Sequence, residues 1–229
     1  FAGRLPAAAP RLVATGALDG WPYVVTSRVP GVPIASVWPG LADAEKVLLS
    51  SEIGATVGAL RGIPTASDSG AAADAWRAFL SDVEGNRDAR QRGLGVPEAR
   101  IDEARQRLRH AASVRDASLV WLHTELLGEH LLVDRDAIGW RLTGVIDWAD
   151  ARVGHPDYEV AALVEFVFRG ARGCLEAFLE AVGEARPDAD RRADLFAWAL
   201  RHRYLHLERL RRTAGGPATL REIEARLYG

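Results

Sequence analysis

One segment in the middle of the chain limits the folds that this sequence can adopt. LVWLHTELLGEHLLVD, residues 119–134, consists of an apolar run, a polar stretch and a second apolar run. RDAIG follows as turn material, and WRLTGVIDW, residues 140–148, is a third β-prone run. This order predicts a strand and a loop, followed by a β-hairpin whose far end returns to the side of the loop. Polar groups from the loop and from the end of the hairpin are therefore expected at one rim.

Titratable side chains are concentrated at that rim. The loop contains His123, Glu125, Glu129 and His130, and Asp147 ends the hairpin among apolar neighbours. A carboxylate in such surroundings is costly unless it is paired or binds a cation. We expect Glu125, His130 and Asp147 to converge, an arrangement that suits a metal ion with a nearby general base. His123 is expected to hold the loop by hydrogen bonds, and Glu129 to face solvent.

The rest of the chain predicts few strands and many helices. RLVATG, ALDGWP and YVVTSRV, within residues 11–29, predict a β-hairpin. Apolar residues recur at helical spacing over residues 43–60, 75–85, 97–113, 159–169, 174–185, 194–212 and 220–228. The order of elements favours an α+β fold with a largely helical second part.

Composition excludes several classes of partner. A formal net charge of −2 gives no basic field that would attract nucleic acid or an anionic membrane surface. No apolar run reaches the roughly 18 residues of a membrane span. Cys174 is the only cysteine, so an internal disulfide is impossible, and a reducing, cytoplasmic location is expected. Nothing in the pattern indicates an oligomeric state.

HTELLGEHLLVD and LTGVIDWADARVGHPDYEVAAL together resemble the aminoglycoside phosphotransferase family, which has a protein-kinase-like fold. The family shows H-G-D-x-x-x-x-N and, after a short hairpin, G-V-I-D-[FW]-x-D-A-x-x-G-D-P-x-Y-D-L-A. The positions in register are Gly144, Val145, Ile146, Asp147, Trp148, Asp150, Ala151, Gly154, Pro156, Tyr158 and Ala161. The departures are Thr124 for Gly, Glu125 for Asp, His130 for Asn and His155 for the Asp of G-D-P.

The resemblance also implies a division of the chain. YVVTSRVPG is similar to the hinge segment of the family, so residues 1–35 would be a remnant of the N-terminal lobe. Residues 36–229 would form the helical C-terminal lobe, with its catalytic loop at 119–134 and its metal-binding Asp segment at 144–161. In this fold a glycine-rich loop and a strand lysine precede the hinge, whereas Lys46, the only lysine, follows it. We therefore expect that this sequence lacks most of the N-terminal lobe.

The activity implied by the resemblance is transfer of the ATP γ-phosphate to a hydroxyl of a small molecule, an aminoglycoside-like antibiotic or a related metabolite. When the roles known for the family are transferred to the matching positions of this sequence, the resemblance implies that Glu125 is the base and that His130 and Asp147 are the ligands of Mg²⁺ or Mn²⁺. Ser27 and Val29 would offer backbone hydrogen bonds to adenine.

Three further carboxylates are candidates for substrate binding, and two histidines are candidates for a metal pair. Asp150, Asp157 and Glu159 could attract a cationic substrate, although Asp157 and Glu159 also suit a helix start. His202 and His206 stand four residues apart and could form a metal pair, but their arginine-rich surroundings favour a solvated face.

Two other functions remain open at this point. The double substitution at Glu125 and His130 is typical of a pseudokinase, a nucleotide-binding or small-molecule-binding module without turnover. A metal-dependent hydrolase that uses the histidines is disfavoured, because its ligands would be scattered and lack a helical metal-pair signature with a base.

Overall fold

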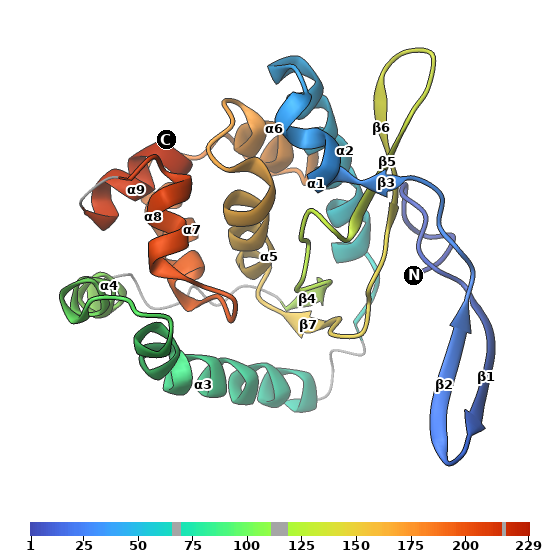
Figure 1. Ribbon diagram of the computed structural model, residues 1–229, viewed down its shortest axis with the longest axis horizontal. Coiled ribbons are helices and arrows are strands. Elements are labelled where there is room, and N and C mark those ends of the chain that lie inside the picture. The colour runs from blue at the N-terminus through green and yellow to red at the C-terminus, as the bar shows by residue number, and fades with distance from the viewer. Residues whose placement is uncertain (66–69, 111–118, 217–218) are drawn as a thin grey trace.

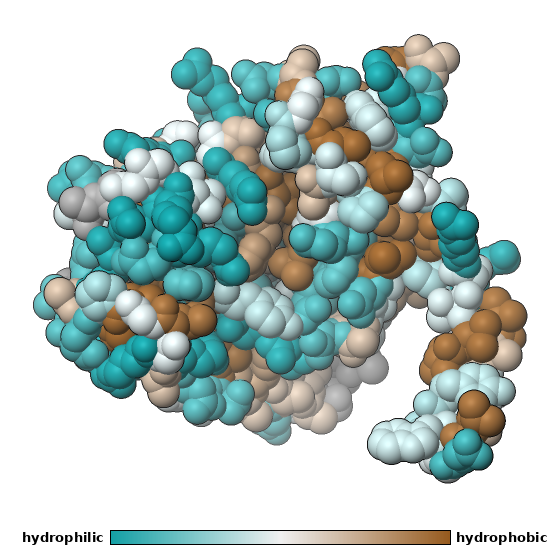
Figure 2. Space-filling model, viewed as in Figure 1, coloured by the Kyte–Doolittle hydropathy of each residue, from teal (hydrophilic) through white to brown (hydrophobic). Residues whose placement is uncertain are grey.

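An exposed hairpin precedes the body of the protein. The computed structural model describes residues 1–65, 70–110, 119–216 and 219–229. Strands β1 (Leu12–Leu18) and β2 (Trp21–Thr26) pair antiparallel around Asp19 and Gly20, whose positive φ values of 50° and 82° suit a tight hairpin turn. Every residue of both strands is exposed. Figure 1 shows the hairpin extending away from the helices, and Figure 2 shows apolar side chains along it.

A small sheet carries the predicted rim. Its order is β3 (Val32–Pro33), β5 (Leu131–Arg135) and β6 (Trp140–Val145), all antiparallel. β5 and β6 form the hairpin that the sequence predicts. The Ala8 carbonyl also accepts a hydrogen bond from the Val145 amide at 2.9 Å. The first residues of the chain and residues 32–33 therefore lie on the same sheet as the hairpin, and the proposed division at residue 35 stays a prediction.

A second pair of strands fixes the start of the loop. β4 (Val120–Leu122) pairs antiparallel with β7 (Arg152–Gly154). The last β-prone run of the sequence pattern ends at residue 148, so the strand at residues 152–154 is a difference from the prediction. At Gly154 a Cβ would lie 2.6 Å from the ring of Trp76, so a close approach there requires glycine.

One long helix packs both against the sheet and against a second helix. α1 (Ile34–Val37) and the 3-10 turn η1 (Trp38–Gly40) lead to α2 (Asp43–Arg61), which contacts α6 (Cys174–Ala181). A Cβ at Gly54 of α2 would lie 2.6 Å from the carbonyl of Phe178, so this glycine lets the two backbones approach. Cys174, at the start of α6, is buried.

A short buried helix lies in the middle of the body (Figure 1). α5 (Asp157–Ala162) is buried at every position and continues as a π-helical segment, η2 (Leu163–Phe168). Figure 1 shows α5 in the middle of the body. The other helices are α3 (Gly70–Gly93), α4 (Glu98–His110), α7 (Ala189–Arg201), α8 (Leu207–Thr213) and α9 (Leu220–Leu227), of which α7 packs directly against α5. None of the helices in the described ranges is both long and apolar enough to cross a membrane.

Two helix predictions need correction. α3 has 24 residues, far more than the eleven positions 75–85, because polar contacts such as that of Asn86 with Asp82 at 2.9 Å continue it beyond its apolar stripe. The single helix predicted over 194–212 is two helices, α7 and α8, separated by residues 202–206. This break changes the candidate site.

Candidate active site

The loop after β4 is held by a buried glutamate. Glu159 of α5 has no exposed surface, and its carboxylate accepts hydrogen bonds from the amides of His123 and Thr124, the latter at 2.9 Å. Burial raises the pKa of Glu159 to about 7, against the lowering effect of these two donors. Thr124 has a φ of 71°, a strained value for a β-branched residue, and stands where the family pattern has glycine.

His123 has the structural role that the sequence predicts. Its Nε2 lies 2.9 Å from the carbonyl oxygen of Ile146, and its ring meets that of Trp148 edge-on at 4.6 Å between centroids. Burial lowers the pKa of His123 to about 4, so the ring is uncharged at neutral pH. The ring thus ties the loop to the segment that carries Asp147.

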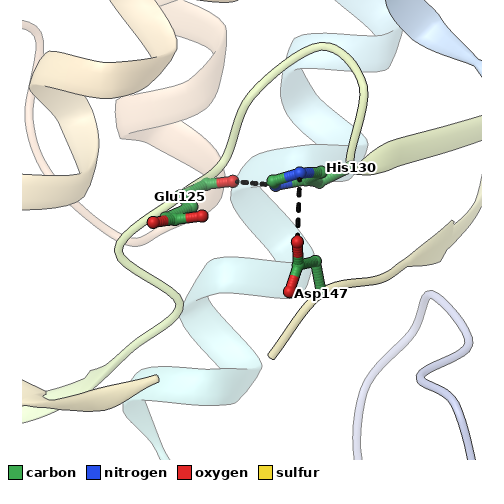
Figure 3. A group of neighbouring side chains, drawn as sticks. All are labelled: Glu125, His130 and Asp147. Atoms are coloured by element: carbon green, nitrogen blue, oxygen red, sulfur yellow. Dashed lines mark hydrogen bonds and ion pairs between the residues drawn. The ribbon is translucent and has the colours of Figure 1, made fainter. Parts of the chain in front are cut away.

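Glu125, His130 and Asp147 come together at the rim (Figure 3). The His130 Nδ1 lies 2.8 Å from the Glu125 backbone carbonyl oxygen. Because a carbonyl only accepts, Nδ1 carries the ring proton and donates this hydrogen bond. The His130 Nε2 then faces the Asp147 carboxylate, 3.4 Å from Oδ2. One ligand atom from each residue lies within 4.8 Å of the other two.

This group has the chemistry of a divalent metal site. An ion with ligand distances of roughly 2.0–2.2 Å sits between donors that are about 3–4 Å apart. Two carboxylates offer the hard oxygens that Mg²⁺ and Mn²⁺ prefer, and the imidazole nitrogen suits Mn²⁺ better than Mg²⁺. Asp147 has a φ of 65°, which turns it out of the strand direction, and half of its side chain is exposed. The residues present therefore fit a divalent ion.

Tyr204 is a site residue that sequence reasoning missed. It lies in the break between α7 and α8, and its hydroxyl donates a hydrogen bond to the Glu125 carboxylate. Partial burial, and then this carboxylate, raise the pKa of Tyr204 to about 12, so the phenol keeps its proton. The residues RHRYLHLE continue the helical pattern without glycine or proline, so no local signal marks the break.

The expected nucleotide contacts lie on the segment after β2. The Ser27 amide donates to the carbonyl of Arg11 at 2.8 Å, and its Oγ accepts from the Arg11 amide at 2.9 Å. These bonds close the base of the β1–β2 hairpin and occupy the Ser27 amide. Val29 is buried against Gly144, where a Cβ would lie 2.1 Å from the valine Cγ1. Adenine contacts at these two positions stay predictions.

The three carboxylates expected near a cationic substrate have different surroundings. Asp157 is buried and forms two 2.6 Å hydrogen bonds with Arg191, and Glu159 holds the loop as described. Both carboxylates are buried and bonded within the protein, so the acceptor site proposed below includes neither of them. Asp150 is partly exposed and pairs with Arg203 at 3.1 Å.

The structure also shows the surroundings of Glu129 and of the two histidines that the sequence pattern offers as a metal pair. Glu129 is exposed, as expected. His202 is buried and His206 caps the start of α8, so these residues do not share a helix face as the sequence pattern suggests. In the described ranges, the group of three or more potential metal ligands is the one at Glu125, His130 and Asp147.

The chain combines a helical lobe with a strand–loop–hairpin unit that presents two carboxylates and a histidine. This combination is typical of the class of kinase-like phosphotransferases. The family model described as "Phosphotransferase enzyme family", abbreviated APH, matches residues 1–211, so the chain belongs to this family. The α+β, kinase-like fold predicted from the sequence is thereby confirmed.

Solved structures agree on the fold. The GDP and kanamycin complex of APH(2")-IIia is 20% identical with a TM-score of 0.68, covering 86% of this chain and 67% of that one. The GDP complex of wild-type aminoglycoside 2'-phosphotransferase-IIIa is 19% identical with a TM-score of 0.67, covering 97% and 77%. The streptomycin–ATP ternary complex of APH(2")-IIa is 15% identical with a TM-score of 0.58, covering 98% and 75%. The chain thus spans about two thirds to three quarters of the length of these neighbours.

Proposed function

We propose that the protein transfers the γ-phosphoryl group of ATP to a hydroxyl of a small molecule. What supports this is the convergence of Glu125, His130 and Asp147 in a chain of this family. The three neighbours cited above are GDP or ATP complexes, which supports a nucleotide as the donor.

In phosphoryl transfer the protein contributes mainly the positioning of the reactants and the stabilisation of charge. The acceptor oxygen bonds to the γ-phosphorus, the bond from that phosphorus to the bridging oxygen breaks, and ADP leaves. Glu125 takes the acceptor proton, and His130 and Asp147 would hold Mg²⁺ or Mn²⁺. A bound divalent ion supplies neutralisation of the phosphate charge. Tyr204 keeps the Glu125 carboxylate oriented until an acceptor hydroxyl takes its place.

The test is phosphate transfer by the full-length protein to a panel of hydroxylated compounds, with Mg²⁺ or Mn²⁺. We expect Glu125→Gln and Asp147→Asn each to lower kcat/KM by about a hundredfold or more. Asp134→Asn is the matched control, since this exposed carboxylate lies on the same hairpin away from the rim. Absence of transfer with either ion, or equal rates for Asp147→Asn and wild type, would refute the proposal.

A binding module without turnover is the second candidate. The observation that favours it is the engagement of the Glu125 carboxylate by Tyr204. Calorimetry with ATP would then detect binding, while the wild type and Tyr204→Phe would both lack transfer. A wild-type rate that collapses in Glu125→Gln excludes this candidate.

A further inference from the structure

A cavity adjoins the site on the side of Tyr204. Its volume is about 390 Å³. Helix α3, the segment around β7 and the break after α7 all contribute to its wall. The lining residues are Phe79, Asp82, Val83, Arg90, Asp150, Arg152, Arg203 and Tyr204.

Tyr204 connects this cavity to the proposed base. The same side chain lines the cavity and donates its hydroxyl to the Glu125 carboxylate. A hydroxylated molecule in the cavity can thus reach Glu125 by replacing one hydrogen bond. The cavity therefore lies where a phosphate acceptor would enter.

The side chains that line the cavity carry a formal surplus of one positive charge. Three arginines and two aspartates line it. One of these aspartates, Asp150, already has two cationic partners, Arg203 at 3.1 Å and Arg152 at 3.5 Å. The Arg152 guanidinium also lies 4.0 Å from the ring centroid of Phe79, which gives this wall an apolar backing.

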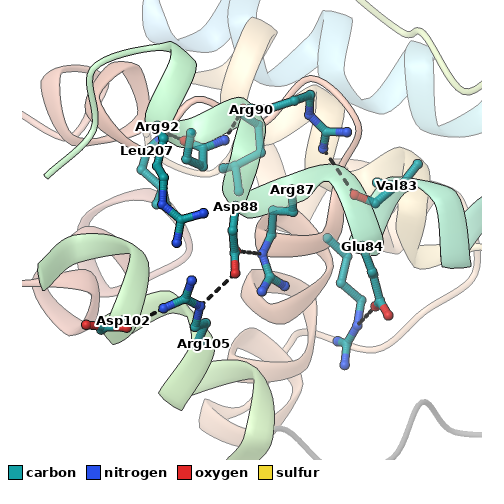
Figure 4. A network of polar contacts seen from close by, with 12 residues as sticks. Val83, Glu84, Arg87, Asp88, Arg90, Arg92, Asp102, Arg105 and Leu207 are labelled. Atoms are coloured by element: carbon teal, nitrogen blue, oxygen red, sulfur yellow. Dashed lines mark hydrogen bonds and ion pairs between the residues drawn. The ribbon is translucent and has the colours of Figure 1, made fainter. Parts of the chain in front are cut away.

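Arg90 forms no ion pair with a carboxylate among the described residues of the chain. Its Nη2 donates to the carbonyl of Val83 at 3.3 Å (Figure 4), its Nε is buried without a hydrogen-bond partner, and none of the carboxylates described here pairs with it. The neighbouring network differs, because Arg87 and Arg105 both bond to Asp88, at 2.9 and 2.6 Å. A guanidinium of this kind is suited to bind a carboxylate or a phosphate through paired hydrogen bonds.

We propose that the phosphate acceptor is a hydroxylated anion, carrying a carboxylate or a phosphate ester, rather than a polycationic amine. This inference rests on the function proposed above and names the substrate class of the same site. The anionic group meets Arg90 and the arginines beside Asp150, while the hydroxyl takes the place of the Tyr204 hydroxyl at Glu125. A polyamine in this cavity would face Arg90, which no described carboxylate neutralises, and two further arginines that share Asp150.

Matched acceptors of different charge test the inference. Glycerol, glycerate and glycerol 3-phosphate form one set, glucose, gluconate and glucose 6-phosphate a second, and kanamycin serves as the polycation. We expect turnover or binding of acids in at least one set, at least about tenfold better than of the neutral member. Carboxylates and phosphate esters within each set distinguish the two anion types. Preference for kanamycin, or no preference for acids over neutral polyols, overturns the inference.

Variants tie the preference to Arg90. Arg90→Gln is expected to lower kcat/KM for the acids roughly tenfold more than for the neutral members, and Arg90→Lys to retain part of the preference. Arg77→Gln is the matched control, because it lies on the same helix with 72% of its side chain exposed. Equal effects of Arg90→Gln and Arg77→Gln overturn the inference.

Calorimetry separates failure of the inference from failure of the proposed function. Acid binding to the Asp147→Asn protein that depends on Arg90 supports the inference even where wild type transfers no phosphate. Transfer to kanamycin alone supports the function and overturns the inference.

Discussion

At the scale of single residues, the substituted metal position has a direct consequence. The His130 Nδ1 donates to the Glu125 carbonyl, which leaves Nε2 as the nitrogen that faces Asp147. His130→Asn replaces this nitrogen by a harder amide oxygen, so we expect the ratio of the Mg²⁺-supported rate to the Mn²⁺-supported rate to rise about tenfold. Initial rates at saturating concentrations of each ion measure it. His206→Asn, at the first turn of α8 and outside the group of Glu125, His130 and Asp147, is the control, and an unchanged ratio would exclude metal contact by His130.

Glu159 predicts a pH dependence of stability. Its pKa of about 7 in the folded protein exceeds the ordinary value of 4.5, so the folded state binds the proton more tightly than the unfolded state. The free energy of unfolding is therefore expected to fall, by up to about 3 kcal/mol, as the pH rises from 4.5 through 7. Glu159→Gln keeps an oxygen for the amides of His123 and Thr124 and cannot ionise.

Urea unfolding of wild type and Glu159→Gln between pH 5 and 8 measures this contribution. The difference in stability should favour the variant increasingly with pH. Parallel curves for the two proteins would contradict the buried, proton-binding carboxylate.

The residues of the rim could be predicted, but their partners could not. The spacing of Glu125, His130 and Asp147 around a hairpin indicates that they meet. The contacts of Glu159 and Tyr204 with the loop span 36 and 79 positions of the sequence, and no local pattern encodes pairs so far apart. Long-range contacts of this kind depend on how the helices pack.

At the scale of elements, the spacing of apolar residues predicts that a helix or strand exists better than it predicts where that element begins and ends. The hairpin at β1 and β2, helix α2 and the β5–β6 hairpin all appear where the pattern indicates them. β7 was missed because a three-residue strand carries almost no periodicity. The break between α7 and α8 was missed because tertiary contacts, such as that of the Arg203 amide with Tyr158, decide it.

Two helical glycines give a matched prediction about packing. A Cβ at Gly54 of α2 would meet the Phe178 carbonyl at 2.6 Å and the Cβ of Ala181 at 2.8 Å, whereas one at Gly85 of α3 would meet nothing within 4 Å. We expect Gly54→Ala to destabilise the protein by about 1–3 kcal/mol, because the α2–α6 contact must open. Gly85→Ala should stabilise it by about 0.5–1 kcal/mol.

Denaturant unfolding of the two variants under one set of conditions provides the measurement. Since each is the same substitution within a helix, each controls for helix propensity in the other. Changes of the same sign would show that the α2–α6 contact does not depend on the glycine.

At the scale of the whole molecule, the β1–β2 hairpin stands apart. Trp21 and Val24 are 80% and 65% exposed. Apolar side chains gathered on exposed paired strands favour association with other surfaces. We expect Trp21→Thr and Val24→Thr together to reduce self-association, measured by light scattering on concentration. The unfolding midpoint should shift by no more than about 2 °C, because the strands contact chiefly each other.

Ile138→Thr is the control, since this single apolar residue is 84% exposed in the β5–β6 turn. It should change neither quantity. A large fall in the midpoint for the hairpin variants would mean that the hairpin supports the body of the protein.

The burial of Cys174 makes the protein convenient for site-specific labelling. Since the sequence holds no second cysteine, a thiol introduced at Leu18, which is 70% exposed near the hairpin tip, would be the accessible one for a maleimide fluorophore. The intrinsic sulfhydryl would stay unreacted while the protein remains folded. Anisotropy of the attached dye would then report how freely the hairpin tumbles, before and after nucleotide is added.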